Sequence, residues 1–166
     1  MWQDRSGRYF LFAVACAAGF VLASGLALPD LVAAHFVAGG SANGFMPRTT
    51  YILIMSCVVI ALPVVMVFLT WGSLERPGAR INLPNRDYWL APERRSRTIA
   101  WIRAGVLQFS GMLIAFLCYA HWLVVRANRT HPAHLDETWF LVGLLAFLAA
   151  GLLWAMGFVR RFRRRV

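Results

Sequence analysis

The chain has 166 residues, of which 60% are hydrophobic, and it carries a formal net charge of +10. This length suits one compact unit and is too short for two full domains. Soluble domains are about 45–50% apolar, so the composition excludes an ordinary soluble protein and indicates surfaces that face lipid. All 17 basic residues are arginine and flank long apolar runs, which favours membrane topology over nucleic-acid binding. We therefore expect membrane lipids, and no nucleic acid, as partners.

Four apolar stretches are long enough to cross a bilayer core of about 30 Å, which takes roughly 20 helical residues. None contains Asp, Glu, Lys or Arg, and aromatic residues lie near their ends, as in an interfacial belt. The sequence predicts an all-α integral membrane protein, a single four-helix transmembrane bundle over residues 1–166. The predicted spans are 9–28, 51–71, 104–125 and 139–159.

The arginines are distributed unequally on the two sides of these spans. Fourteen lie before the first span, between the second and third, and after the fourth, whereas only Arg48, Arg126 and Arg129 lie in the other two loops. Short arginine-rich loops resist translocation, so this bias predicts that the N- and C-termini are cytoplasmic. The expected localisation is a bacterial cytoplasmic (inner) membrane, with the chain multi-pass.

Small residues recur at every fourth position within the spans, as in Ala15, Gly19 and Ala23, or Gly111 and Ala115. Faces of this kind allow two helices to approach closely. We predict that these faces pack within the four-helix bundle, and a homodimer seam is the alternative.

The sequence of the loop between the first two spans predicts an ordered structure on the outer side. Its proline ends the first helix, and its glycines permit positive φ and tight turns. The apolar residues between the glycines predict a loop folded onto the outer face of the bundle. His35 and Asp30 are expected to have defined positions in this loop. The His35 imidazole is expected to form a hydrogen bond that holds the loop in place. The motif residues are Pro29, Asp30, His35, Phe36, Gly39, Gly40 and Gly44.

The loop between the second and third spans is rich in aromatic and charged residues. Tyr88 and Trp89 are of the type that lies at the level of lipid headgroups. Pro92 suits the first position of a helix, so an interfacial helix is predicted to start there and to bend into the third span. We favour a membrane-anchoring elbow in contact with anionic headgroups, and a ligand-binding loop is the alternative. The motif residues are Pro84, Asn85, Asp87, Tyr88, Trp89, Pro92, Glu93, Arg94 and Arg95.

Both motifs have counterparts in a known family. The first contributes Leu28-Pro29, His35-Phe36 and Gly44, and the second contributes the run from Pro84 to Arg95. On these residues the chain resembles a bacterial membrane domain-of-unknown-function family related to the N-terminal domain of the sporulation-delaying-protein immunity protein, which protects a cell from a toxic peptide. The resemblance covers nearly the whole chain and implies a four-helix membrane fold. Ala33 stands where the family carries a second proline.

Histidines and carboxylates gather on the predicted outer side. Imidazole and carboxylate groups are ligands of zinc and copper, and Pro132 disfavours the helical turn that would align His131 with His134. The alternative is that His121 snorkels at the interface and the loop histidines are solvated. The candidate metal ligands are His35, His131, His134 and Asp136.

The chemistry of the spans argues against transport and catalysis. They carry no Asp, Glu, Lys or Arg of an ion-coupled pathway, and no nucleophile elbow, phosphate loop or HExxH motif occurs. We expect a non-catalytic protein that binds or responds to a partner, either another membrane protein or a peptide, in the immunity or envelope-stress role that the resemblance implies. Two alternatives stay open, namely an accessory subunit of a larger membrane complex and a metal-dependent enzyme acting on a lipid or prenyl substrate.

Overall fold

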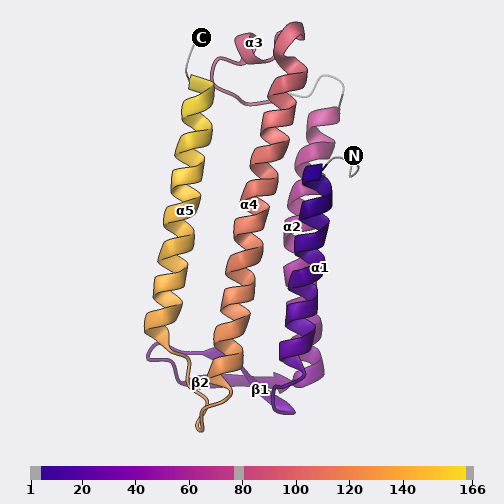
Figure 1. The fold of residues 1–166 in the computed structure, drawn as a ribbon. Helices are drawn as coiled ribbons and strands as arrows, with labels where there is room; N and C mark the ends of the chain where they lie inside the picture. Colours follow the sequence, from indigo (N-terminus) through magenta and orange to yellow (C-terminus); the bar gives the residue numbers. More distant parts are fainter. Residues whose placement is uncertain (1–4, 77–80, 164–166) are drawn as a thin grey trace.

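The computed structural model describes residues 5–76 and 81–163, and in these residues four helices are long and apolar enough to cross a membrane. They are α1 (Arg5–Gly25), α2 (Arg48–Glu75), α4 (Pro92–Ala127) and α5 (Glu137–Arg163) (Figure 1). The four predicted spans are confirmed, and these helices make the chain a multi-pass membrane protein.

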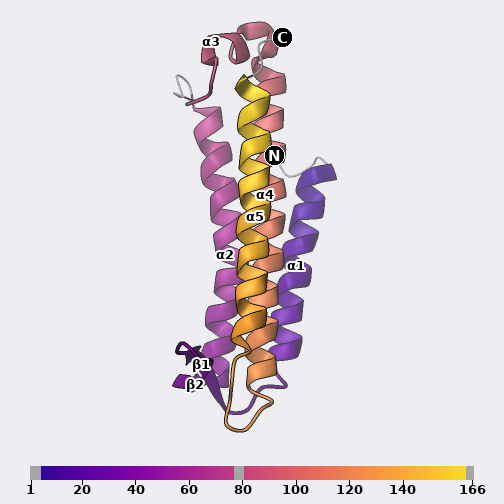
Figure 2. The same cartoon turned by 90° about the vertical axis from the view of Figure 1, so that its left-hand side faces the viewer.

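The long helices run side by side, so their ends gather at opposite ends of the molecule (Figures 1 and 2). One end carries strands β1 (Leu31–Phe36) and β2 (Ala42–Pro47) together with the α4–α5 connection, and we call it the hairpin end. The other carries the start of α1, the short helix α3 (Arg86–Trp89) and the end of α5, and we call it the arginine end. The segment predicted as a folded loop is thus an antiparallel β-hairpin.

The four helices are not packed evenly. α1, α2 and α4 pack against one another, whereas α5 packs along α4, as Figures 1 and 2 show from two sides. The shared core of the three helices includes the fully buried Val21, Val59 and Val67. None of the most apolar window of α5 is buried inside the protein. The architecture is therefore a three-helix core with a fourth helix attached to one of its members.

Glycines of α4 and α5 allow the close approach of these two helices. A Cβ atom added to Gly105 would lie 2.7 Å from the Phe158 ring, and one added to Gly143 would lie 2.0 Å from the Tyr119 ring. The contact is thus built from aromatic rings seated on glycines, a way of packing helices that does not depend on exclusion of water.

The small-residue face of α1 does not pack inside the protein. Ala15, Gly19 and Ala23 are all exposed, and a Cβ added to Gly19 or Gly111 would meet no atom within 4 Å. The prediction that these faces pack within the bundle is therefore wrong for α1, whose face points outward. Periodicity shows that small residues share one face of a helix, and which neighbour covers that face depends on the tertiary arrangement.

α4 is one continuous helix of 36 residues that starts at Pro92. Its length is about 54 Å at 1.5 Å per residue, well beyond the thickness of a bilayer core. The predicted helix start at Pro92 is confirmed, and the helix continues from there through the third predicted span without interruption. The first turns of α4 extend past the ends of α1 and α5 (Figure 1).

We predict that Gly143→Ala destabilises the protein by about 1–3 kcal/mol, as overpacking does. The added methyl group displaces Tyr119, whose hydroxyl donates a hydrogen bond to the Trp139 carbonyl at 2.6 Å. Gly111→Ala is the matched control, because its methyl group enters open space and alanine favours a helix. Thermal unfolding in detergent measures both, and equal stability of the two variants would refute this account of the α4–α5 contact.

Candidate functional site

The outer-loop motif forms the hairpin end. β1 and β2 pair antiparallel with Leu31 opposite Pro47 and Ala33 opposite Phe45, and the register shifts around His35, which lies opposite Gly44. This pairing places the motif residues of β1 and β2 side by side at one end of the helices.

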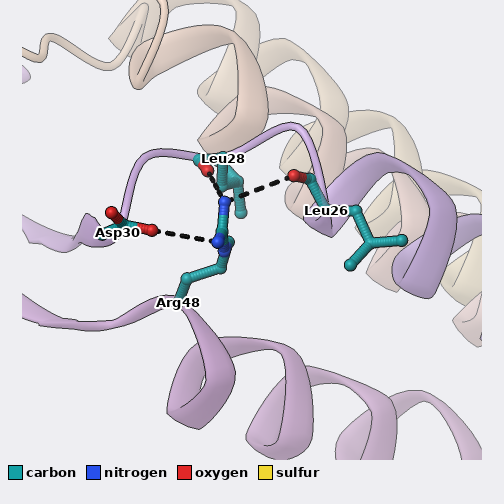
Figure 3. Close-up of polar contacts among 4 residues, drawn as sticks. All are labelled: Leu26, Leu28, Asp30 and Arg48. Carbon is teal, nitrogen blue, oxygen red and sulfur yellow. Dashed lines mark hydrogen bonds and ion pairs between the residues drawn. The ribbon is translucent and has the colours of Figure 1, made fainter.

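Arg48 joins the hairpin to the end of α1 (Figure 3). One guanidinium nitrogen lies 2.9 Å from the Asp30 carboxylate, and the other donates hydrogen bonds to the carbonyls of Leu28 at 2.9 Å and Leu26 at 3.4 Å. The Asp30 side chain is 95% exposed, so the ion pair itself contributes little. The larger effect is that Arg48 supplies donors to carbonyls that follow the last turn of α1.

Asn128 holds the hairpin against α4. Its Oδ1 accepts a hydrogen bond from the Ala33 backbone N–H at 2.9 Å, and its Nδ2 donates to the Ala33 carbonyl at 3.0 Å. Nδ2 also donates to the Val124 carbonyl at 2.9 Å, which fixes the amide on its own helix. The buried side chain of Asn128 therefore takes the place of a neighbouring strand along β1.

The hairpin turn is tied to the start of α5. Gly39 and Gly40 have φ of +87° and +79°, a region that favours glycine. The Gly39 N–H donates to the Glu137 carboxylate at 3.0 Å, and the Leu135 N–H donates to the Gly40 carbonyl at 2.8 Å. A Cβ on Gly40 would lie 2.1 Å from the Leu135 carbonyl oxygen, so the contact requires glycine.

A polar cavity of about 400 Å³ lies between this turn, the end of α4 and the start of α5. It combines a guanidinium, an imidazole, two carboxylates and two hydroxyl groups. One carboxylate, that of Asp136, also accepts a hydrogen bond from the Trp139 N–H at 3.2 Å and so caps α5. Such a cavity can bind polar groups of either charge. The polar lining residues are Arg126, Thr130, His134, Asp136, Glu137 and Thr138.

The loop histidines are not gathered into one centre. His35 and His131 are exposed, and His134 lines the cavity. Within residues 5–76 and 81–163, no three His, Cys, Asp or Glu side chains lie close enough together to hold a metal ion. The zinc or copper site stays a prediction. The predicted pinning hydrogen bond of His35 is wrong, because Arg48 and Asn128 make the contacts that hold the hairpin.

His121 lies inside the helical core and does not snorkel to the surface. It is fully buried, with Nε2 at 2.8 Å from Ser24 Oγ and Nδ1 at 2.9 Å from the Tyr51 hydroxyl. Because Ser24 donates its proton to the Phe20 carbonyl at 2.6 Å, its oxygen accepts from Nε2–H. Nδ1 then accepts from Tyr51, a tautomer that we assign from the network. The chain of hydrogen bonds connects α1, α2 and α4.

The inner-loop motif caps the end of α5 at the arginine end. Trp89 is buried, and its Nε1 donates to the Phe162 carbonyl at 2.8 Å. Asn85, in a left-handed conformation with φ of +53°, donates to the carbonyls of Phe162 and Arg163, both at 3.2 Å. α5 therefore covers the Trp89 ring and separates it from lipid headgroups, whereas the predicted headgroup depth of Tyr88 and Trp89 stays a prediction.

The remaining residues of this motif surround that cap. The Arg94 guanidinium lies 4.1 Å from the centre of the Tyr88 ring, a cation–π distance. Pro92 occupies the first turn of α4 together with Glu93. Pro84 is half-buried, whereas Asp87, Glu93 and Arg95 are exposed. The motif thus acts as a structural elbow held by α5, and its exposed charges remain free to contact headgroups.

Comparisons of this chain with protein-family models, curated proteins and solved structures find no match.

Several residues that build this site were not singled out from the sequence. Each lies inside a predicted span or within three residues of its end, where sequence alone gives a polar residue the appearance of a span flank or of an isolated substitution. No local sequence pattern indicates that Asn128 lies beside a strand residue 95 positions earlier in the chain. These residues are Ser24, Arg48, Tyr51 and Asn128.

We predict that Asn128→Ala releases the hairpin from α4. Each Ala33 backbone group left buried without a partner costs about 1–3 kcal/mol, so amide hydrogen exchange at Ala33 should accelerate strongly. Asn43→Ala is the matched control, because Asn43 is exposed on β2. Equal exchange at Ala33 in both variants, measured by mass spectrometry in detergent, would contradict the proposed clamp.

His121→Leu should lower the free energy of unfolding by about 1 kcal/mol, the usual size of a hydrogen bond between membrane helices. The substitution keeps the volume roughly constant and leaves the buried Tyr51 hydroxyl without its partner. His131→Leu, at an exposed position, is the control and should leave stability unchanged. Unfolding in detergent measures both, and a His121→Leu protein as stable as the control would show that the network is dispensable.

Proposed function

We propose that this chain is a non-catalytic, partner-binding protein of a bacterial cytoplasmic membrane, and that it binds an extended peptide segment along the free edge of β2. The observation that carries the proposal is an edge strand with exposed apolar side chains. Phe45 is 55% exposed and Leu31, on the neighbouring strand, is 61% exposed. Exposed apolar residues beside an unpaired edge are typical of a binding surface.

The hydrogen-bonding pattern supports this edge as the binding site. Ala33 directs its backbone N–H and C=O groups to Asn128 and not to β2. In the alternating pattern of an antiparallel pair, the residue opposite Ala33 then also points its backbone groups away from its partner strand. The backbone N–H and C=O groups of Phe45 are therefore directed away from β1. Ser41, which directly precedes β2, bridges to His134. Beyond that bridge, no strand among the described residues pairs with the edge of β2 that faces away from β1. An added strand would gain backbone hydrogen bonds from the edge and specificity from side chains.

The charge bias suggests on which side the partner arrives. If the arginine end is cytoplasmic, the hairpin end faces outward, where a secreted peptide meets the membrane. The polar cavity beside the hairpin turn, with Arg126 and Glu137 in its lining, offers charged groups to polar side chains of the partner. This agrees with the immunity role implied by the resemblance of both loop motifs.

A second candidate function is that of an accessory subunit in a larger membrane complex. The exposed small-residue face of α1 and the unburied apolar surface of α5 favour it, because each can pack closely on a helix of another protein. Co-purification of a stoichiometric membrane protein in mild detergent, lost on Gly19→Leu but kept on Gly72→Leu, would select this candidate.

We predict that deletion of the gene sensitises cells to at least one member of a panel of membrane-active peptides. The wild-type gene restores protection, whereas Phe45→Lys gives about tenfold weaker protection, as expected for loss of an interface hot spot. Ser96→Lys, an exposed position on α4 at the arginine end, adds the same charge and should protect fully. Growth inhibition in each strain is measured at matched membrane levels of the variants.

A photo-cross-linking residue at position 45 identifies the partner in the same strains. We expect a cross-linked peptide at position 45 and none at position 68, where Phe68 is exposed on α2 within its apolar span. Unchanged sensitivity across the panel, or full protection by Phe45→Lys, would overturn the peptide-binding function.

A further inference from the structure

We propose that the groove between α4 and α5 at the arginine end binds one anionic phospholipid. Its phosphodiester would contact the guanidinium groups of Arg97 and Arg161, and one acyl chain would lie in the groove along the helices. The site is separate from the hairpin end and does not rest on the proposed function.

The groove has a volume of about 320 Å³ and is lined by both helices. Its aromatic wall consists of Trp154 and Phe158, whose rings stack with centroids 5.3 Å apart. Phe158 sits on Gly105, while a Cβ added to Gly157 would meet no atom within 4 Å. The absence of a side chain at Gly157 therefore leaves space beside the aromatic wall. A flexible hydrocarbon chain can fill such an apolar groove and make van der Waals contacts with its walls. Disordered bulk lipid would contact the same wall atoms less closely.

Two positive charges lie near the Trp101 ring, which lines the groove together with Arg161. The Arg161 guanidinium lies 3.9 Å from the centre of the Trp101 indole, and that of Arg97 lies 4.8 Å from the same centre. The ion pairs formed within residues 5–76 and 81–163 are Arg48 with Asp30 and Arg103 with Glu75, so neither guanidinium has an acidic partner there. An anionic phosphodiester near the Trp101 ring would offset the positive charge of both guanidinium groups.

The position of these two arginines along the helices favours a lipid over a soluble anion as the ligand. Trp101 lies just before the predicted third span, at the depth where tryptophan meets headgroups. Gln108 lies at the deep end of the groove, exposed and without a hydrogen-bond partner among the described residues. Side chains tilt toward the N-terminus of their helix, which for α4 is the arginine end. An amide at this position in the groove can donate a hydrogen bond to an ester carbonyl of the bound lipid.

The experiment uses the full chain, purified in mild detergent and titrated with phosphatidylglycerol or with phosphatidylcholine of the same acyl chains. Native mass spectrometry should detect one phosphatidylglycerol bound in preference to phosphatidylcholine. The double variant Arg97→Gln/Arg161→Gln should weaken this binding about 25-fold, since each arginine near a headgroup contributes a factor of about five. Arg95→Gln, at an exposed position on α4, should bind as the wild type does.

A second pair of variants tests the groove itself. Gly157→Leu places a side chain in the groove and Gly72→Leu places the same side chain on α2, and in both cases the added Cβ meets no atom within 4 Å. We expect loss of phosphatidylglycerol binding in the first and retention in the second, with thermal unfolding confirming that both fold. Equal binding of the two lipids, equal weakening by Arg95→Gln, or full binding by Gly157→Leu would overturn the proposal. Competition by inorganic phosphate as effective as that by phosphatidylglycerol would also overturn it, because the site would then be one for a free anion.

Discussion

Backbone carbonyl and N–H groups at the ends of helices and along the edges of strands have no partner within their own element, and those that the protein buries must find one elsewhere in the protein. In this chain three side chains meet that constraint by reaching across the tertiary structure. Arg48 binds the carbonyls that follow α1, Asn128 pairs with both backbone groups of Ala33, and Trp89 binds the Phe162 carbonyl near the end of α5. The positions of the hairpin and of the inner elbow both follow from these contacts.

The same contacts decide which surfaces are left open. With one edge of β1 occupied by the amide of Asn128 and its other edge by β2, the edge of β2 is where another strand can add. The turn of the hairpin is held by Glu137 and Leu135 from the α4–α5 connection, so the edge is presented by a rigid support. Pre-organisation of this kind lowers the entropic cost of binding.

The attachment of α5 follows a different rule. In lipid, apolar surface alone does not drive helices together. α5 is joined to α4 by rings seated on glycines and by the Tyr119 hydroxyl, and its far end is joined to α3 by the Trp89 indole. A helix packed along only part of its surface leaves grooves at its margins, and the groove at the arginine end is lined by Arg161, which has no acidic partner among the described residues. Lipid is therefore proposed to complete an interface that protein atoms leave open.

The sequence by itself determined the four spans, because a run of about 20 apolar residues has one stable arrangement in a membrane and its signal is local. It also identified the hairpin loop and the elbow as specified segments and placed the start of α4 at Pro92. Only the tertiary structure decided that His35 is exposed while His121 is buried, that the small-residue face of α1 points outward, and that Trp89 lies beneath α5. Each of these depends on which helix lies beside which, a relation between residues up to 97 positions apart that periodicity and composition along the chain do not encode.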